Sequence, residues 1–384
     1  MVIGVICEYN PFHNGHLRQL RLIREAFGAD AKIVCLMSGR FVQRGEPAIL
    51  APSVRTQAAL DCGADLVLEL PITCALQSAE GFAKGAVEIF DRLGIVDVLC
   101  FGSESGDTDA LVRTARAMCG TEYEEALRRH LSGGVSYAAA RQAALNETGA
   151  DASLSEKPND ILALEYCKAL TERKSRIRPF AIRREGDYHE KTPDAAQPSA
   201  ASLRLLPTEQ WKPFIPPEAE AAYAGARRYS LSAGEQAMLA RLRGKTDWET
   251  VPFGSEGLWC KVRKAAWSEA SVQAVIDAAK SKRYVRTRLQ RLLLCAYLGI
   301  TQDDLRRPIS FVRVLGFSEA GRSLIRTAKK QGGIGIVNAG EKPQDTEYSA
   351  LECRAERLYA LFAEDGDYSA EEQKKSLPRE RKVR

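Results

Sequence analysis

Short apolar runs alternate with longer amphipathic segments over the first hundred residues of the chain. The short runs are rich in Val, Ile and Leu, which is typical of buried strands bounded by turn residues. They predict strands at residues 2–7, 32–37, 64–70 and 96–101. Between them, apolar residues recur at helical spacing and predict helices at about 17–27, 52–62 and 78–93. Strands that alternate with helices favour a parallel sheet covered by helices on both faces.

The pattern changes after residue 105. Residues 106–175 have mostly helical periodicity, 178–183 predict one more strand, and a helix restarts at 199–206. A proline-rich linker follows, and residues 218–330 then predict helices with few strand signals. The last stretch is polar, and its basic end at 374–384 is typical of disorder. We therefore predict three parts, which are a sheet-containing domain at 1–205, a mainly helical domain at 206–338, and a tail at 339–384.

Composition narrows the class of protein. The chain has 384 residues, of which 45% are hydrophobic and 27% charged, as expected for a globular protein of two or three domains. No segment approaches the roughly 20 apolar residues that span a bilayer, and we expect no leader peptide, because no basic region followed by a cleavable apolar segment is seen before the first strand. The ten cysteines are scattered and form no CxxC pair, which favours a reduced protein without structural zinc. We expect a cytoplasmic protein that binds no membrane and needs no obligate protein partner.

Two of the four histidines lie where the first predicted strand meets the first helix. The segment His13-Asn14-Gly15-His16 follows the carboxyl end of that strand, which is where open α/β sheets bind ligands. A helix N-terminus favours phosphate, and Gly15 lets the backbone approach a ligand closely. Two imidazoles there can stabilise the charge on a triphosphate that is attacked at its α-phosphorus. The pattern predicts a nucleotide site; two surface histidines at a helix start are the plainer interpretation.

Other candidate residues follow the later strands. Gln43 or Arg44, in a loop after the second strand, could hold a small carboxylate or phosphates, or the loop could be an ordinary surface loop. Gly102 ends the fourth strand, where a base or ribose could pack on the backbone, or where the chain only turns. Ser199 opens a predicted helix whose hydroxyls and N–H groups could receive phosphates, or it is an ordinary N-cap.

A basic region lies at 279–330, which contains thirteen Lys or Arg residues and three acidic ones. Basic side chains flank an amphipathic helix within it. They could form a solvated helix face, but beside a nucleotide-activating domain a surface for a phosphate backbone is the better interpretation. The candidates for this contact are Arg283, Arg286, Arg288 and Arg291.

Several motifs in order resemble one family. An H-x-G-H segment after the first strand is the signature of the HIGH-type nucleotidyltransferase superfamily. Residues 8–16 (EYNPFHNGH), 37–48, 157–162, 188–189 and 198–200 resemble the tRNA(Met) cytidine acetate ligase family. The resemblance runs from residue 1 to about 205, and more weakly to about 320 through residues 313–317. The chain departs from the family pattern at Glu190, where Asp is usual, and the segment before it is slightly shorter. Whether Arg183 or Arg184 contacts ATP therefore stays open.

The resemblance implies a Rossmann-like parallel-sheet nucleotidyltransferase domain, followed by a mainly helical C-terminal domain that binds tRNA. It implies that acetate attacks ATP to give acetyl-adenylate and pyrophosphate, with His13 and His16 as the catalytic residues. The N4 amine of the wobble cytidine of elongator tRNA(Met) then attacks the acetyl carbon to give N4-acetylcytidine and AMP. Mg²⁺ is expected as well, because it would neutralise the triphosphate.

The resemblance also implies a set of ATP contacts, in which Asn159 could equally be a helix N-cap. The set comprises Cys7, Glu8, Tyr9, Asn10, Pro11, Phe12, His13, Asn14, Gly15, His16, Leu17, Arg18, Gln19, Leu20, Gly102, Asn159, Arg183 or Arg184, and Ser199. Two other functions remain open at this point. One is a small-molecule adenylyltransferase that needs no RNA, and the other is a nucleotide-regulated RNA-binding protein without catalysis.

Overall fold

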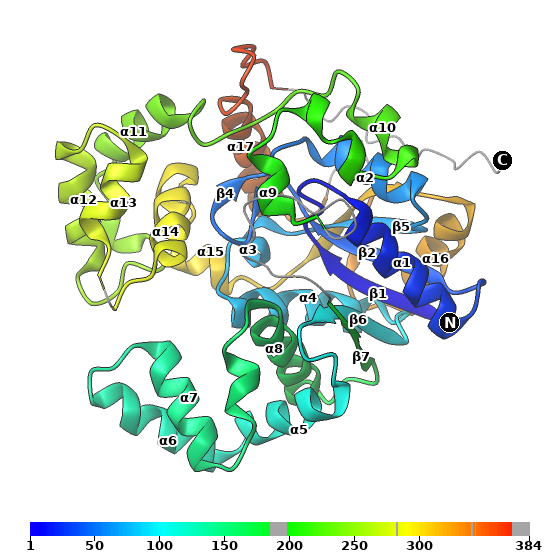
Figure 1. The fold of residues 1–384 in the computed structure, drawn as a ribbon. Coiled ribbons are helices and arrows are strands. Elements are labelled where there is room, and N and C mark those ends of the chain that lie inside the picture. The colour runs from blue at the N-terminus through cyan, green and yellow to red at the C-terminus, as the bar shows by residue number, and fades with distance from the viewer. Residues whose placement is uncertain (185–197, 282, 339–340, 342, 371–384) are drawn as a thin grey trace.

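A seven-stranded sheet forms the centre of the computed structural model, which describes residues 1–184, 198–281, 283–338, 341 and 343–370 (Figure 1). The strand order is β7-β6-β1-β2-β5-β8-β9. The strands are β1 Val2–Cys7, β2 Lys32–Ser38, β5 Leu66–Leu70, β6 Val98–Ser103, β7 Arg178–Arg183, β8 Phe311–Phe317 and β9 Gly335–Val337, with a separate hairpin of β3 Phe41–Val42 and β4 Glu46–Pro47. The Tyr188-His189 motif and the predicted disordered end at 374–384 lie outside the described residues.

The helices confirm the alternating pattern of the first domain. They are α1 Asn14–Phe27, α2 Pro52–Asp61, α3 Ile72–Ala75, α4 Ala79–Leu93, α5 Thr108–Met118, α6 Thr121–Ser132, α7 Tyr137–Glu147, α8 Pro158–Glu172, α9 Ala200–Arg204, α10 Pro217–Tyr223, α11 Glu235–Arg243, α12 Leu258–Ser268, α13 Val272–Ala279, α14 Arg286–Leu298, α15 Gln302–Arg306, α16 Glu319–Gln331 and α17 Thr346–Ala360. Strands β1, β2, β5, β6 and β7 pair with one another in parallel. The predicted α/β fold is therefore confirmed.

Helices cover both faces of the sheet because successive strand residues point to opposite sides. In β2, Val34 and Leu36 pack into a core with α4, α5, α8 and α16. Ile33 and Cys35, one position away, pack into a second core with α1, α2 and α10. The near-continuous apolar run of β2 is what a strand buried on both faces requires, and it leaves the strand ends as the places for polar chemistry.

The sheet contains two strands that the sequence pattern did not predict. β8 pairs antiparallel with β5, and β9 pairs in parallel with β8. Both come from residues 206–338, which we expected to be mainly helical, and the sequence pattern predicted neither strand. The run of β8 is short and has Arg313 within it, and its partner lies some 240 residues earlier in the chain, so local periodicity could not reveal the pairing. The division of the chain at 205 and 338 stays a prediction.

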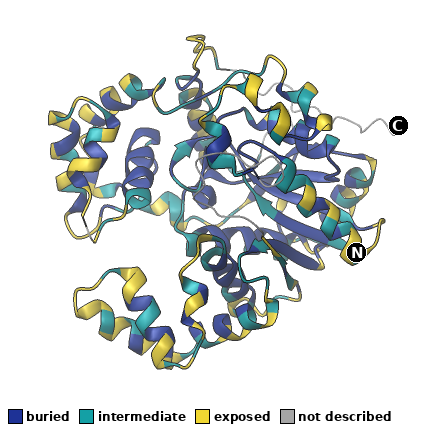
Figure 2. Ribbon diagram, viewed as in Figure 1, coloured by how far each residue is buried: buried dark blue, intermediate teal, exposed yellow. Residues whose placement is uncertain are grey.

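A third core joins the C-terminal helices. Figure 2 shows α14 as a largely buried helix, and its residues from Leu289 to Leu298 are buried among α11, α12, α13 and α17. Helix α17 lies in the stretch that we expected to be a polar tail, and it buries Leu351, Ala355 and Tyr359 in the same core. The amphipathic helix that we expected in the basic region is α14, and it is enclosed on most sides.

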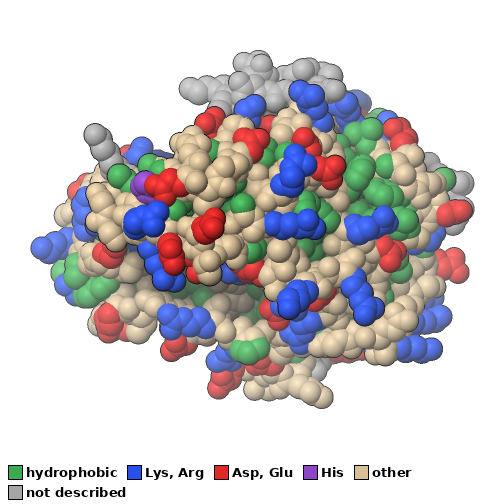
Figure 3. Space-filling view, turned by 90° about the horizontal axis from the view of Figure 1, so that it is seen from below, with side chains coloured by type: hydrophobic (Ala, Val, Ile, Leu, Met, Phe, Trp, Pro, Cys, Tyr) green, Lys and Arg blue, Asp and Glu red, His purple; other side chains and the backbone are tan. Residues whose placement is uncertain are grey.

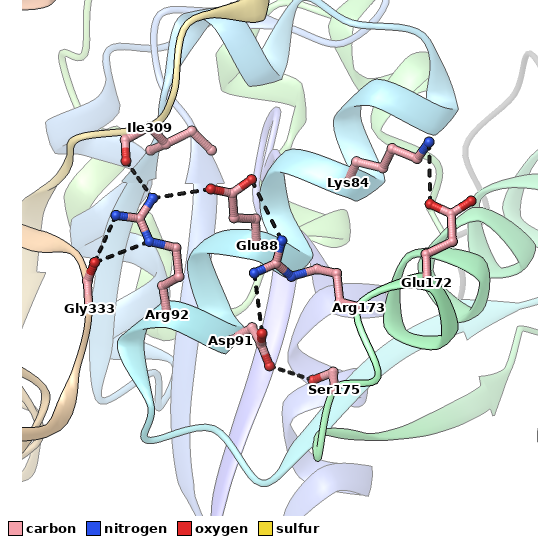
Figure 4. A network of polar contacts seen from close by, with 9 residues as sticks. All are labelled: Lys84, Glu88, Asp91, Arg92, Glu172, Arg173, Ser175, Ile309 and Gly333. Carbon is pink, nitrogen blue, oxygen red and sulfur yellow. Dashed lines mark hydrogen bonds and ion pairs between the residues drawn. The ribbon is translucent and has the colours of Figure 1, made fainter.

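Hydrogen bonds connect the segments just before β8 and β9 to the first domain (Figure 4). Arg92 at the end of α4 donates from Nη1 to the carbonyl of Ile309 at 2.6 Å and from Nη2 to that of Gly333 at 2.7 Å. Arg173, after α8, pairs with Asp91 of α4 at 3.3 Å.

On the face seen in Figure 3, the Lys and Arg side chains of the described residues are interspersed with Asp and Glu. None of the helices in the described part of the chain has both the length and the hydropathy that a membrane span requires.

We expect Arg92→Ala to lower the free energy of unfolding by about 1–2 kcal/mol, because two carbonyls lose a charged donor. Urea denaturation followed by tryptophan fluorescence would measure it. Arg128→Ala is the matched control, since that side chain is 78% exposed and pairs with Glu124 only at 3.7 Å; its effect should stay within about 0.5 kcal/mol. Equal effects of the two substitutions would contradict a tether through Arg92.

Candidate nucleotide site

A cavity of about 360 Å³ opens at the carboxyl ends of β1, β6 and β7. The segment after β1 forms one wall, the start of α8 and the end of β7 form another, and residues 198–204 close a third. This is the crevice in which open α/β sheets bind ligands. The structure thus brings together residues that lie almost 200 positions apart in the sequence.

His13 and His16 cap helix α1 reciprocally. His13 is the N-cap residue, and its Nδ1 accepts a hydrogen bond from Gly15 N at 3.1 Å. The Nδ1 of His16 in turn accepts from His13 N at 3.2 Å. The two rings stack with centroids 3.8 Å apart. The imidazoles therefore do what Ser and Glu do in an ordinary capping box, and they satisfy two N–H groups that the helix cannot.

This capping assigns the tautomer of both rings. A neutral imidazole has one donor nitrogen and one acceptor nitrogen. Because Nδ1 accepts a backbone hydrogen bond in both residues, the proton of each neutral ring lies on Nε2. His13 and His16 then have an Nε2–H donor each, beside the N-terminus of α1 in the cavity wall. Two such donors next to a helix N-terminus suit an anionic ligand.

Burial keeps these rings neutral in the free protein. Burial first, and then the charge of Arg184, lower the pKa of His13 to about 3. The pKa of His16 is also well below its usual range, first because of burial and then because of His13 and Arg184. In the free protein, the cavity disfavours the protonated form of both imidazoles at neutral pH. An anionic ligand in the cavity would instead stabilise the protonated form.

Gly15 is required by the same arrangement. A Cβ at this position would lie 3.0 Å from Cε1 of the His13 ring, so any larger residue would push the ring off the N–H that it caps. The absence of a side chain at Gly15 therefore leaves room for the His13 ring as well as for a ligand.

The opposite side of the cavity has a chain of polar contacts across β6 and α8. Arg184 Nη1 donates to Asn159 Oδ1 at 3.3 Å, and Asn159 Nδ2 donates to Glu104 Oε1 at 2.7 Å. A Cβ on Gly102 would lie 2.9 Å from Arg184 Cδ, so the guanidinium stem passes directly over this glycine. The N-cap of α8 is Lys157, and Asn159 therefore does not cap the helix, which was the alternative interpretation.

Arg183 and Arg184 both line the cavity, but they differ in their contacts. Arg184 lies over Gly102 and bonds Asn159, whereas the side chain of Arg183 packs against Gly106, where an added Cβ would meet its Cβ at 2.6 Å. The structure thus joins Arg184 to the other candidate residues of this wall. Its contact with a nucleotide stays a prediction.

The 7–20 segment only partly faces the cavity. Cys7, Glu8, Tyr9, Asn10, His13, Gly15, His16, Arg18 and Gln19 line it, whereas Pro11, Phe12, Asn14, Leu17 and Leu20 are not in its wall. Phe12 and Leu20 are in the core beneath it. Asn10 accepts from Ile49 N at 2.7 Å through Oδ1, and its carbonyl accepts from Arg204 Nη1 at 3.0 Å. Several residues in this segment therefore shape the cavity through their backbone rather than through exposed side chains.

The remaining candidates divide in the same way. Ser199 caps α9 by accepting from Ser202 N at 3.1 Å, and it also lines the cavity. Gln43 and Arg44 line the cavity from the turn between β3 and β4. The N–H of Gln43 donates to Glu8 Oε1 at 2.8 Å, and its side chain reaches the carbonyl of Gln77 at 3.3 Å. The β3–β4 turn is therefore fastened to the end of β1.

One of the four basic candidates of the C-terminal region is not on the surface. Arg283 pairs with Glu256 at 2.6 Å, Arg286 pairs with Asp277 at 3.7 Å, and Arg288 donates to the carbonyl of Phe253 at 3.0 Å. Arg291 is buried instead, and burial lowers its pKa to about 10.

Arg291 meets the wall of the cavity from α14. Its Nη1 donates to the carbonyl of Gln43 at 3.4 Å, and its guanidinium lies 5.2 Å from the ring centre of Phe253. Gln290, next to it, donates to Glu46 Oε1 at 2.8 Å. A Cβ on Gly45 would lie only 2.6 Å from Arg291 N. The turn and α14 thus pack backbone against backbone, which only glycine permits.

Sequence reasoning missed Arg55, which lies on α2 and is 0% exposed. Its guanidinium donates to the carbonyls of Glu8 at 2.6 Å, Ser38 at 3.0 Å and Leu50 at 3.0 Å, and to that of Gly39. Glu8 follows β1 and lines the cavity, Ser38 and Gly39 lie at the end of β2, and Leu50 precedes α2. The only sequence signal is a lone Arg on the buried face of a predicted helix, which has no recognisable motif.

Comparisons with known proteins match most of the length of this chain and agree on one family. The model of the family described as HIGH Nucleotidyl Transferase matches residues 1–375. A protein of Syntrophotalea carbinolica named tRNA(Met) cytidine acetate ligase is 38% identical over 381 residues, which cover 94% of this chain and 88% of that protein. One of the same name from Acetivibrio thermocellus is 37% identical, over 88% of this chain and 87% of that protein.

The fold of this chain is also similar to that of a protein of known structure. The crystal structure of Thermotoga maritima TmcAL bound with alpha-thio ATP has a TM-score of 0.86 and 30% sequence identity, and the match covers 96% of this chain and 97% of that one. The apo form of the same protein gives a TM-score of 0.89 at 31% identity.

Arg55→Met should lower the free energy of unfolding by about 3 kcal/mol, since each buried carbonyl left without a partner costs about 1–3 kcal/mol. Guanidinium denaturation measures the loss. Arg21→Met, on the exposed side of α1, is a matched control that should change stability by less than about 0.5 kcal/mol. A similarly small effect at Arg55 would show that its carbonyls find water or other partners.

The lowered pKa of His13 makes stability depend on pH. A ring whose folded-state pKa lies below its unfolded value stabilises the fold above the unfolded pKa, and this contribution is lost as the pH falls toward 3. We expect unfolding free energy to decline below about pH 6.5. His13→Asn keeps a capping side chain and should flatten the decline. ¹⁵N NMR should show a neutral His13 ring at pH 5, and a protonated ring there would refute the assignment.

Proposed function

This chain belongs to the tRNA(Met) cytidine acetate ligase family of HIGH nucleotidyl transferases, and we propose that it acetylates tRNA(Met) with ATP and acetate. Acetate attacks the α-phosphorus of ATP, acetyl-adenylate forms and pyrophosphate leaves. The exocyclic amine of the wobble cytidine of elongator tRNA(Met) then takes the acetyl group, and N4-acetylcytidine and AMP are released. A tRNA substrate places the protein in the cytoplasm.

The reciprocal capping of α1 by His13 and His16 is the observation that carries the first step. Two Nε2–H donors beside a helix N-terminus stabilise the charge that develops on the phosphates as acetate attacks and pyrophosphate leaves. Because the backbone already fixes both rings, they need no reorganisation during the reaction. No side-chain nucleophile is required, since the mixed anhydride is itself the activated acyl group.

The rest of the cavity suits the other parts of ATP. We propose that the adenosine lies on the side of Gly102 and Asn159, with Arg184 in contact with it, and that Ser199 and the start of α9 receive phosphate oxygens. Gln43 or Arg44 on the opposite side holds the acetate carboxylate. The structurally similar Thermotoga maritima protein was solved with alpha-thio ATP bound, which supports nucleotide binding by this fold.

Mg²⁺ remains a prediction. Within the described residues, no group of three or more His, Cys, Asp or Glu side chains comes together that could hold a metal ion. We therefore derive no step through the metal, and triphosphate oxygens would have to supply most of its ligands.

The defining experiment is mass spectrometry of nucleosides from tRNA(Met) incubated with the protein, ATP and acetate. Formation of N4-acetylcytidine that requires all three components is the expected result. Pyrophosphate release with another acid, in the absence of RNA, would instead identify a small-molecule adenylyltransferase. ATP binding without AMP or pyrophosphate formation would identify an RNA-binding protein without catalysis.

Two sets of variants should separate activation from tRNA binding. His16→Ala should lower acetate-dependent exchange of pyrophosphate into ATP by about 100-fold or more, with tRNA binding nearly unchanged. Combined replacement of Arg283, Arg286 and Arg288 by Gln should weaken tRNA binding and reduce its salt dependence, with exchange unchanged. If both folded variants lost both activities, the proposed division of roles would be wrong.

A further inference from the structure

The second step of the proposed reaction requires a proton acceptor. As the N4 lone pair forms a bond to the acetyl carbon, the bond between that carbon and the phosphate oxygen breaks, and its electron pair leaves with AMP. The nitrogen must also lose one of its two protons. His13 and His16 have their Nδ1 atoms occupied by backbone N–H groups, so neither neutral ring offers a free acceptor nitrogen.

Glu8 is placed to take this proton. It follows β1 directly, and its side chain lines the cavity. Among the described residues in the cavity wall, the acidic side chains are Glu8 and Glu46. The carboxylate of Glu46 accepts from Gln290 Nε2 at 2.8 Å, which turns it toward α14. Glu8 Oε1 accepts from the backbone N–H of Gln43 at 2.8 Å, a bond that orients the carboxylate without neutralising it.

The position of Glu8 also suits the incoming base. The proposed adenosine contacts lie on the β6 and α8 side of β1, whereas the Gln43 bond holds Glu8 toward the β3–β4 turn that follows β2. Helix α14 of the basic C-terminal region packs against that same turn through Gly45 and Arg291. An RNA bound along this region would bring its base to the cavity from the side on which Glu8 lies.

We propose that Glu8 is the general base of acetyl transfer, an inference that rests on the proposed function. Its carboxylate accepts a hydrogen bond from the N4 amine of the cytidine and takes the proton as the C–N bond forms. Carboxylates are the usual acceptors for the N4 amino group of cytosine, so the same contact favours a cytidine over a uridine, which presents an oxygen at that place. After AMP leaves, Glu8 returns the proton to water.

The surroundings of Glu8 adjust its basicity. Burial raises its pKa, while the backbone bond from Gln43 and the charges of Arg204, Arg44 and Arg55 oppose that rise. Tyr166 of α8 also interacts with it. A carboxylate with a raised pKa is a stronger base than an exposed glutamate.

Glu8→Gln is the decisive variant. The amide oxygen of Gln can still accept from Gln43 N, so the turn stays fastened, but it cannot take a proton. Glu8 is also one of the expected ATP contacts, so acetate-dependent exchange of pyrophosphate into ATP is measured for each variant as the reference, and the fall in acetyl transfer should exceed any fall in exchange. Single-turnover transfer from the preformed acetyl-adenylate complex to tRNA(Met) should fall by about 100-fold or more. Glu46→Gln makes the same chemical change in the same cavity wall, and it should leave both rates near those of the wild type.

The pH profile gives an independent readout. Transfer by the wild type should rise with pH and level off above the pKa of Glu8, which burial raises from the ordinary glutamate value, and the Gln variant should lack this rise. Normal transfer by Glu8→Gln, or an equal loss of exchange and transfer, would overturn the role of Glu8. Absence of acetate-dependent exchange in the wild type would instead overturn the proposed function.

Discussion

The buried guanidinium of Arg55 is the constraint on which the candidate site depends. Parallel strands end with carbonyl groups that no neighbouring strand can satisfy, and the loops after β1 and β2 must turn sharply to form a cavity. Arg55 donates to carbonyls of both loops. Its five donors on a rigid plane suit this task better than any other side chain. The cost of burying a cation is offset because every contact is a charge-assisted hydrogen bond.

The chemistry of the cavity is built on that support. The carbonyl of Glu8 is held by Arg55, the carboxylate of Glu8 is held by the β3–β4 turn, and five residues later His13 begins α1. Each functional side chain is therefore fixed by a backbone contact. His13 and His16 cap a helix with the nitrogen that is not needed for a ligand, which leaves the other nitrogen as a donor of known position. Preorganised donors of this kind stabilise developing charge without moving.

Much of this could be predicted from the sequence, and the limits are physical. Local patterns predicted the five parallel strands and the histidine segment, because apolar runs and a helix start depend on neighbouring residues. They could not predict β8, whose partner β5 is distant in the sequence, nor α17 within a stretch that reads as polar. Arg291 was assigned to a surface because its charge suggests solvent, yet its neighbours bury it beside Gln43. Arg55 was missed because its partners are carbonyls, which leave no trace in a side-chain pattern.

The strand order explains why the two half-reactions can use one cavity. The chain passes from β1 to β2 and β5 on one side, and then returns to form β6 and β7 on the other side of β1. The crossovers on the two sides run in opposite directions, so a crevice opens at the end of β1. The residues proposed to hold the nucleotide come from the β6 side, and the turn that holds Glu8 comes from the β2 side. Because β8 extends the sheet beyond β5 and α14 contacts the turn, the C-terminal region lies on the side that we propose for the acyl acceptor. An RNA bound there can approach the acetyl group while the adenylate is still in place.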